Sequence, residues 1–440
     1  MTFSRIPALR RVLTPVMLAA LAGTATIAWQ APAMAQKKEK AAAAAKANYS
    51  KEFIAAYKPF EELSKATPPD TAAMKAALPA LMTAVKTEDD RLVAGQAYVS
   101  VGNAAKDSAL QLQGIEMMLQ SGKSDPARTG QIALAGGQIA YNAKDYAKAR
   151  TFLTKAAELG ITEGDPQILI AETYFGQNDT AGGLKYLEGA IAARKAAGQP
   201  VSELWMKRAL SSAYTGKLNA EARKWGMLYA REFPNQTSWG DAIAVAINTE
   251  QYQPADMLDI LRLARRTGTL RTRAMYLEYV DAADARKLPN EVLTLIDAGI
   301  AAKVIDGNVQ MVKDARATAT SRIAIDKKEV PSLQRDASAP GAKLVTVMAA
   351  ADTLLSYGQY AEAETLFAKA AVMPGANVPM VLTRQGIAQV EQGKHAEAQA
   401  TFAKVQGSRA SIAALWSLYA AQKASGTTIA PATASATTTS

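Results

Sequence analysis

The sequence contains no cysteine and only one histidine among 440 residues. Disulfides, thiolate metal sites, a cysteine nucleophile and a lipid-modified N-terminal cysteine are therefore excluded. A metal site built from several histidines is impossible, and a Ser-His-Asp triad would have to use His395. We expect no metal and no cofactor, and a fold that is held together by packing alone.

Aromatic residues are also scarce, at 6% of the chain, although hydrophobic residues make up 49%. Alanine supplies much of the apolar content. It is the best helix former, and its small side chain lets neighbouring helices approach closely. The composition therefore favours an all-α protein of closely packed helices.

Long apolar runs are missing after residue 35, but the N-terminus has the layout of a secretory signal peptide. Three arginines lie within the first 11 residues, an apolar run extends from Val16 to Trp29, and Ala33-Met34-Ala35 is a small-x-small cleavage site. The run is short against the ~20 residues that span a bilayer. We expect cleavage after Ala35 and a periplasmic or secreted protein without a membrane span. The alternative is that residues 1–35 stay attached as an anchor.

The chain has a mild excess of positive charge, with a formal net charge of +10. Such an excess favours solubility and a bias towards acidic surfaces. Because an exported protein does not meet nucleic acid, we expect no nucleic-acid partner, and an acidic component of the cell envelope is the charged partner that fits.

Four segments share one pattern of small and large residues. They form two pairs, in which matching residues lie 34 apart (Ala149 and Gly183) and 35 apart (Ala363 and Ala398). The segments are residues 142–157 and 177–192, then 356–371 and 391–405.

This period, with its helix–turn–helix punctuation, resembles the tetratricopeptide repeat (TPR) family. The family has small residues at repeat positions 8, 20 and 27, where side chains must let two helices approach. The resemblance implies an exported bacterial TPR protein built as an α-solenoid of antiparallel helix pairs. The matching residues are Gly137, Ala171, Ala351 and Gly386 at position 8, Ala149, Gly183, Ala363 and Ala398 at position 20, and Ala156, Ala190, Ala370 and Val405 at position 27.

The rest of the chain is assigned from the same pattern and its interruptions. We expect a signal peptide (1–35), a Lys/Ala-rich linker (36–48), degenerate helical pairs (49–130), a TPR-like array (131–329, clear at 131–195), a loop between two sub-arrays (330–342), a C-terminal repeat pair with a capping helix (343–423), and a disordered Ala/Ser/Thr tail (424–440).

The resemblance also implies a binding surface, because TPR arrays hold partners on the concave face lined by first helices. The residues that it places there are Gln138, Tyr141, Asn142, Glu172 and Phe175. The alternative for the two aromatic residues is packing against a neighbouring repeat. The Lys/Asn clamp for a terminal carboxylate is missing from this face, since Leu134 and Gln138 stand at its positions.

A second candidate is an arginine cluster in residues 261–279. It suits an acidic partner, and the alternative is a solvated helix end favoured by the helix dipole. The cluster consists of Arg262, Arg265, Arg266, Arg271 and Arg273.

The sequence as a whole predicts a non-enzymatic scaffold that binds a protein or peptide partner in the bacterial periplasm. One alternative is a membrane-tethered component of an envelope assembly or secretion complex. The other is an enzyme that acts on envelope polymers with acids such as Glu88 and Asp89. Acids at a helix start also complement the helix dipole, and their spacing does not favour catalysis.

Overall fold

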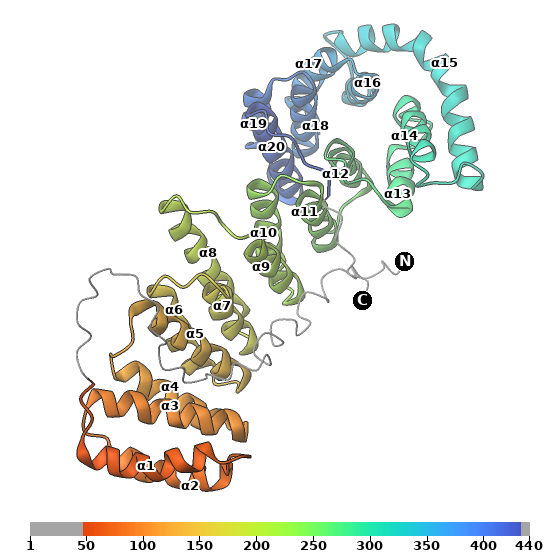
Figure 1. The fold of residues 1–440 in the computed structure, drawn as a ribbon. Coiled ribbons are helices and arrows are strands. Elements are labelled where there is room, and N and C mark those ends of the chain that lie inside the picture. Colours follow the sequence, from red (N-terminus) through yellow and green to blue (C-terminus); the bar gives the residue numbers. More distant parts are fainter. Residues whose placement is uncertain (1–46, 433–440) are drawn as a thin grey trace, which may run out of the picture. The chain divides into compact units, whose positions relative to one another are not determined.

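The structure, a computed structural model, describes residues 47–432 and divides into two compact units (Figure 1). Unit 1 extends to Gln199, and unit 2 begins at Pro200. The predicted signal peptide and most of the predicted linker lie outside the described residues. The boundary falls inside the array that the sequence predicts for residues 131–329.

Unit 1 consists of successive helices joined by short turns. They are α1 (Lys51–Lys65), α2 (Thr71–Ala84), α3 (Glu88–Ala105), α4 (Ser108–Gln120), α5 (Pro126–Asn142), α6 (Tyr146–Glu158), α7 (Pro166–Gly176) and α8 (Thr180–Ala196).

Unit 2 is helical as well, and its helices vary more in length. They are α9 (Glu203–Thr215), α10 (Asn219–Glu232), α11 (Gln236–Thr249), α12 (Pro254–Arg266), α13 (Arg273–Ala283), α14 (Pro289–Ala301), α15 (Gln310–Ser338), α16 (Leu344–Ser356), α17 (Tyr360–Ala371), α18 (Val378–Glu391), α19 (His395–Phe402), the 3-10 turn η3 (Gly407–Arg409) and α20 (Ala410–Ala424).

The predicted all-α class and its helix pairs are therefore confirmed for residues 47–432. Within each unit, consecutive helices pack against each other as antiparallel neighbours, which is the arrangement of an α-solenoid (Figure 1). Across the same residues, no helix has both the length and the apolar character needed to cross a bilayer.

Each of four consecutive helices of unit 1, α5 to α8, has an aspartate at its N-cap position, just before its first residue. The side chains of Asp125, Asp145, Asp165 and Asp179 accept hydrogen bonds from backbone N–H groups three residues later, at 2.8–3.3 Å. Each bond satisfies one N–H that has no partner inside its helix, and it contributes about 1 kcal/mol. The start of each of these helices is thus set by local sequence.

Small residues lie where the paired helices cross, as the repeat pattern predicts. Ala149, Ala363 and Ala398 are fully buried. A methyl group added to Gly137 would lie 2.5 Å from Cγ of Leu153, and one added to Gly386 would lie 2.4 Å from the Phe402 ring. The large side chains therefore occupy the space that the glycines leave free.

Another close crossing, between α3 and α4, was not predicted. A Cβ on Gly95 would lie 2.7 Å from the carbonyl oxygen of Gly114, and a Cβ on Gly114 would lie 2.5 Å from the carbonyl oxygen of Gly95. The two backbones touch at this point, so neither position has room for a side chain.

The predicted loop at residues 330–342 is wrong for its first nine residues. Helix α15 continues to Ser338 with Pro331 inside it, although an internal proline costs about 3 kcal/mol. Val330 and Ala337 are buried on either side of the proline. Lys369 donates hydrogen bonds to the carbonyl oxygens of Ala337 and Ala339, both at 2.7 Å. Tertiary packing and this lysine cap outweigh the local signal.

The predicted disordered tail is also partly wrong. After α20 ends, Ala430 forms a parallel bridge with Asn235. The N–H of Gln236 donates to the Ala430 carbonyl at 2.8 Å, and the N–H of Ala430 donates to the Pro234 carbonyl at 3.0 Å. Residues 433–440 lie outside the described residues.

Unit 2 closes on itself, which the repeat pattern did not predict. Its last helix, α20, packs against α10, α11, α12 and α18. Trp239 Nε1 donates to Gln422 Oε1 at 3.1 Å, and Gln422 Nε2 donates to the Ala230 carbonyl at 2.8 Å. Helix α15 leads from α14 to α16 (Figure 1). The early helix α12 contacts the late helices α18 and α20.

Candidate functional site

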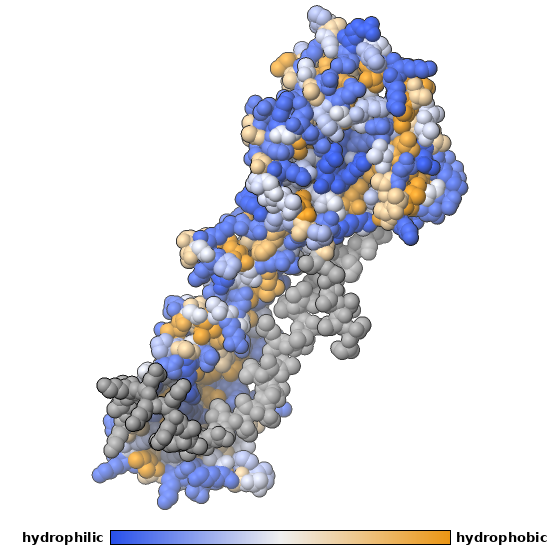
Figure 2. Space-filling model, turned by 45° about the horizontal axis from the view of Figure 1, so that its top comes forward, coloured by the Kyte–Doolittle hydropathy of each residue, from blue (hydrophilic) through white to orange (hydrophobic). Residues whose placement is uncertain are grey.

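A polar cavity of about 280 Å³ lies in unit 2, between α12, α14, α18 and the turn that joins α16 to α17. Three arginines of α12 line it, together with hydroxyl, amide and carboxylate groups from the other elements. On the face of unit 2 seen in Figure 2, hydrophilic residues gather at the centre and apolar residues flank them.

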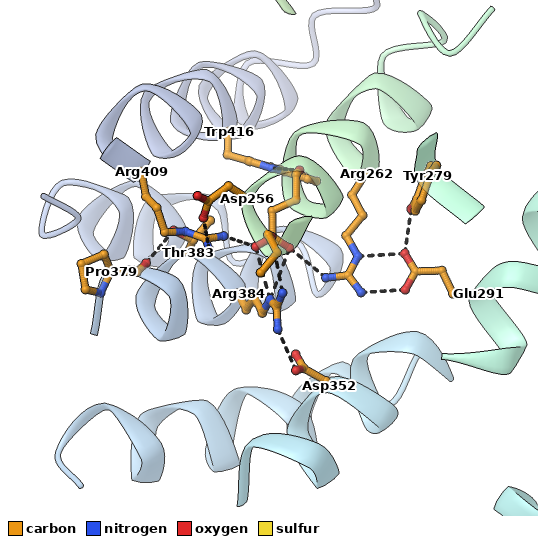
Figure 3. Close-up of polar contacts among 12 residues, drawn as sticks. Asp256, Arg262, Tyr279, Glu291, Asp352, Pro379, Thr383, Arg384, Arg409 and Trp416 are labelled. Atoms are coloured by element: carbon orange, nitrogen blue, oxygen red, sulfur yellow. Dashed lines mark hydrogen bonds and ion pairs between the residues drawn. The ribbon is translucent and has the colours of Figure 1, made fainter. Parts of the chain in front are cut away.

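A buried ion-pair network centred on Asp259 of α12 adjoins the cavity and shares Arg262, Tyr279 and Glu291 with it (Figure 3). The Asp259 carboxylate is fully buried. It accepts from Arg262 at 2.9 Å, from Arg384 at 3.2 Å and from Arg409. Arg384 and Arg409 come from the end of the chain, so the network joins helices that are more than 120 residues apart in sequence.

The outer carboxylates of the network give it four acids for three guanidiniums. Glu291 of α14 accepts two hydrogen bonds from Arg262, at 2.8 and 2.6 Å, and one from the Tyr279 hydroxyl at 2.7 Å. Arg384 also pairs with Asp352 at 2.7 Å, and Arg409 pairs with Asp256 at 2.7 Å. Each buried guanidinium thus has at least two carboxylate partners.

The network keeps the carboxylates of Asp259 and Glu291 ionised. Burial opposes ionisation of Asp259, but Arg384, Arg409 and Arg262 outweigh it and hold the pKa of Asp259 below its usual value. Glu291 behaves in the same way beside Arg262, and its pKa is also lowered. These two acids are held by charged partners and are poor proton donors, whereas burial raises the pKa of Asp352.

Arg265 and Arg266 lie at the cavity itself and differ in their partners. Arg266 Nε donates to Glu391 of α18 at 2.6 Å, although burial still raises the pKa of Glu391. Arg265 is half-buried, and within residues 47–432 it makes no hydrogen bond or ion pair. It is the guanidinium of this cavity that remains able to bind another group.

The predicted arginine cluster is therefore only partly one site. Arg262, Arg265 and Arg266 converge on the cavity, and Arg262 is already committed to the buried network. Arg271 is exposed and bonds the Gly268 carbonyl at 3.1 Å, and Arg273 is exposed at the start of α13. Neither of these two lines the cavity.

The predicted surface of unit 1 is also smaller than the resemblance implies. On α5, Asn142 is exposed, and Gln138 and Tyr141 are half-buried. The ring of Tyr141 packs edge-on against Tyr146, with centroids 5.7 Å apart. These three side chains lie on the first helix of the α5–α6 pair.

The two candidates on α7 both take part in packing, and their role in partner binding stays a prediction. Glu172 is only 7% exposed. The Phe175 ring fills the α7–α8 crossing, since a Cβ on Gly183 would lie 2.3 Å from it. This contact is the packing that the alternative for Phe175 expects, and the residue is half-buried.

The acidic residues at the start of α3 are structural. Asp90 is fully buried and accepts from the backbone N–H groups of Ser50 and Thr87, at 3.1 and 3.0 Å. Asp89 accepts from the N–H of Asn48 at 2.8 Å and pairs with Lys123 at 3.3 Å. Glu88, the other acid weighed for catalysis, pairs with Arg91 at 3.3 Å. These carboxylates cap α3 and fasten the start of α1 to it. In the described part of the chain, no group of three or more His, Asp or Glu side chains is placed to hold a metal ion.

Most of the cavity could not be found from sequence. Tyr279, Asn290, Glu291 and Glu391 were not predicted, because they lie on helices whose neighbours depend on how unit 2 closes. The local signal was the arginine run of α12.

Comparison with known proteins adds little to this geometry. No family model matches the chain, and no curated protein matches it significantly. One solved structure that matches is the crystal structure of the APC/C hetero-tetramer Cut9-Hcn1, at 14% identity and a TM-score of 0.23. The match covers 75% of this chain and 66% of that chain. A TM-score this low carries no argument about function, so the fold description rests on the helix packing itself.

Proposed function

We propose that the protein is a non-enzymatic interaction scaffold of the bacterial periplasm, which binds segments of partner proteins on the face formed by first helices. One observation carries the proposal: the helix pairs stack through tiny side chains at their crossings. Stacked helix pairs form extended, shallow surfaces, and such surfaces suit protein segments better than small substrates.

The α5 surface is the most direct place to look for a partner. Asn142 is exposed, and Gln138 and the Tyr141 ring are half-exposed beside it. A planar aromatic ring next to two amide side chains can hold an extended chain by apolar contact and hydrogen bonds.

Site-specific photo-crosslinking in intact cells tests this surface. A photoreactive residue at Asn142 should capture one or a few specific proteins. The matched control is the same residue at Lys155, which is exposed on α6, the second helix of that pair. Identical adducts at both positions, or none at Asn142, would contradict the proposal.

Export has its own measurement. Mass spectrometry of the protein from a periplasmic fraction should find a chain that begins at Gln36. A chain that keeps residues 1–35 and sediments with membranes would instead favour the tethered alternative.

A further inference from the structure

The cavity of unit 2 is lined by one guanidinium, that of Arg265, that has no hydrogen-bond or ion-pair partner within residues 47–432. Three arginines and two carboxylates line it. Arg262 is paired with Glu291, and Arg266 is paired with Glu391. Arg265 is left without a hydrogen bond or an ion pair within residues 47–432, and it is half-buried. A guanidinium taken partly out of water favours an anion beside it.

The wall of the cavity around Arg265 is held in place by contacts within the protein, before any ligand binds. Arg262 is 7% exposed and is fixed by Asp259 on one side and Glu291 on the other. Asn290 Nδ2 donates to the Ser356 carbonyl at 2.7 Å, which ties α14 to the end of α16 across the cavity. Such a wall is preorganised, so binding costs little ordering of side chains.

Size and lining limit what the cavity can hold. Its volume of about 280 Å³ is at the lower end of ligand pockets, which are roughly 300–1,000 Å³. Leu355, Ile387 and Trp416 supply apolar contacts. The space therefore fits one amino-acid-sized group with an apolar part.

We propose that this cavity binds a monocarboxylate that carries an apolar group next to its carboxylate, and that Arg265 binds the carboxylate. A single carboxylate can pair with the one guanidinium of the cavity that has no ion-pair partner. A phosphate dianion would bring a second charge close to Glu291 and Glu391, so it fits less well. The ligand is either a free carboxylic acid or the end of a peptide, and both present the same chemistry. The site is independent of the α5 surface of unit 1.

Methyl NMR of residues 36–440 tests the proposal, because Ile387 lines the cavity and its methyl signal can be assigned with I387V. The probes are N-acetyl-leucine, N-acetyl-leucinamide, inorganic phosphate and a pentapeptide that ends in leucine with a free carboxylate. N-acetyl-leucine should shift the Ile387 signal with saturation, and the amide should bind at least about tenfold more weakly.

The variants locate the charge. R265Q should weaken binding of N-acetyl-leucine at least about tenfold, and R265K should retain part of it. R273Q is the matched control, since Arg273 is exposed in the same unit and outside the cavity, and it should bind as the unaltered protein does. If R265Q does not fold, two measurements still test the proposal: the comparison of N-acetyl-leucine with N-acetyl-leucinamide, and the binding of N-acetyl-leucine to R265K.

Several outcomes would overturn the proposal: equal binding of acid and amide, no shift of Ile387 with any carboxylate, unchanged binding in R265Q, or phosphate that binds more tightly than N-acetyl-leucine. Tighter binding of the pentapeptide than of N-acetyl-leucine supports a peptide end as the ligand, and weaker binding supports a free acid. Because cross-links form at Asn142 in unit 1 and the NMR signal comes from Ile387 in unit 2, either result can fail without the other.

Discussion

Glycine residues in this protein differ in whether a facing helix occupies the place where a Cβ would lie. At Gly95 the neighbouring atom is a backbone carbonyl oxygen of the facing helix, which cannot rotate away. Gly189, in α8, has no atom within 4 Å of the place where its Cβ would lie. The same residue type thus has opposite roles in two helices of unit 1.

This difference gives a matched pair of substitutions. Gly189→Ala should raise the free energy of unfolding by about 0.5–1 kcal/mol, because alanine is the better helix former. Gly95→Ala should lower it by about 1–3 kcal/mol, because the α3–α4 crossing is overpacked. Urea unfolding followed by far-UV circular dichroism measures both. Equal effects of the two substitutions would show that the crossing does not need glycine.

A carboxyl group of α11 makes stability depend on pH. Burial raises the pKa of Asp241 to about 6, and Lys207 only partly offsets this. The native state therefore holds this proton more tightly than the unfolded state does. The contribution of Asp241 to the free energy of unfolding is therefore greatest below about pH 4, and it falls as the pH rises through 6.

Asp241→Asn should remove that loss. We expect it to stabilise unit 2 at pH 8 by on the order of 1–3 kcal/mol and to change little at pH 4. Asp281→Asn, at an exposed position of α13, is the control. Thermal melts across pH 4–8 make the measurement, and a gain that is independent of pH would contradict this account.

Between elements, the Asp259 network holds the early and late helices of unit 2 together. It pairs three guanidiniums with one central carboxylate and three outer ones. Trp416 of α20 adds a hydrogen bond from its Nε1 to the Asp259 carbonyl at 2.9 Å. Relative to an apolar core, such a cluster contributes little to the free energy of unfolding. Removing one of its partners lowers that free energy far more, because the remaining buried charges are left uncompensated.

Asp259→Asn should therefore destabilise unit 2 by about 3–5 kcal/mol. Asp284→Asn is the control, since its ion-pair partners Arg286 and Lys287 are about four-fifths exposed, and it should cost less than about 1 kcal/mol. Tryptophan fluorescence during urea unfolding reports on unit 2, because every tryptophan of residues 47–432 lies there. Similar midpoints for both variants would mean that the network does not hold the unit closed.

At the scale of the whole molecule, the two units use one local design in different ways. Unit 1 consists of helix pairs with capped starts and close crossings. Unit 2 has the same kind of pairs, but α20 and the tail at Ala430 return to α10–α12 and the start of α11. The α5 surface belongs to the first unit and the arginine cavity to the second, so their ligands can differ.

The fold was predictable from sequence where local and repeat signals agree. Alanine and glycine at the crossings, aspartates at helix starts and prolines after turns all act within about one repeat. The α15 helix was missed because buried Val330 and Ala337 outweigh Pro331. The sequence leaves the role of Phe175 open, because the same spacing serves for packing and for binding.

The sequence by itself determined that the protein is all-α, where its helix pairs cross, and which helix carries the arginines. These features depend on residues that are close along the chain, where helix periodicity and side-chain size decide the outcome. Only the tertiary structure decided that unit 2 closes, that Arg262 is buried in an ion-pair network, and that Arg265 is left at a cavity. Those facts depend on contacts such as Arg384–Asp259 and Arg409–Asp256, between residues 125 and 153 apart, which no local pattern encodes.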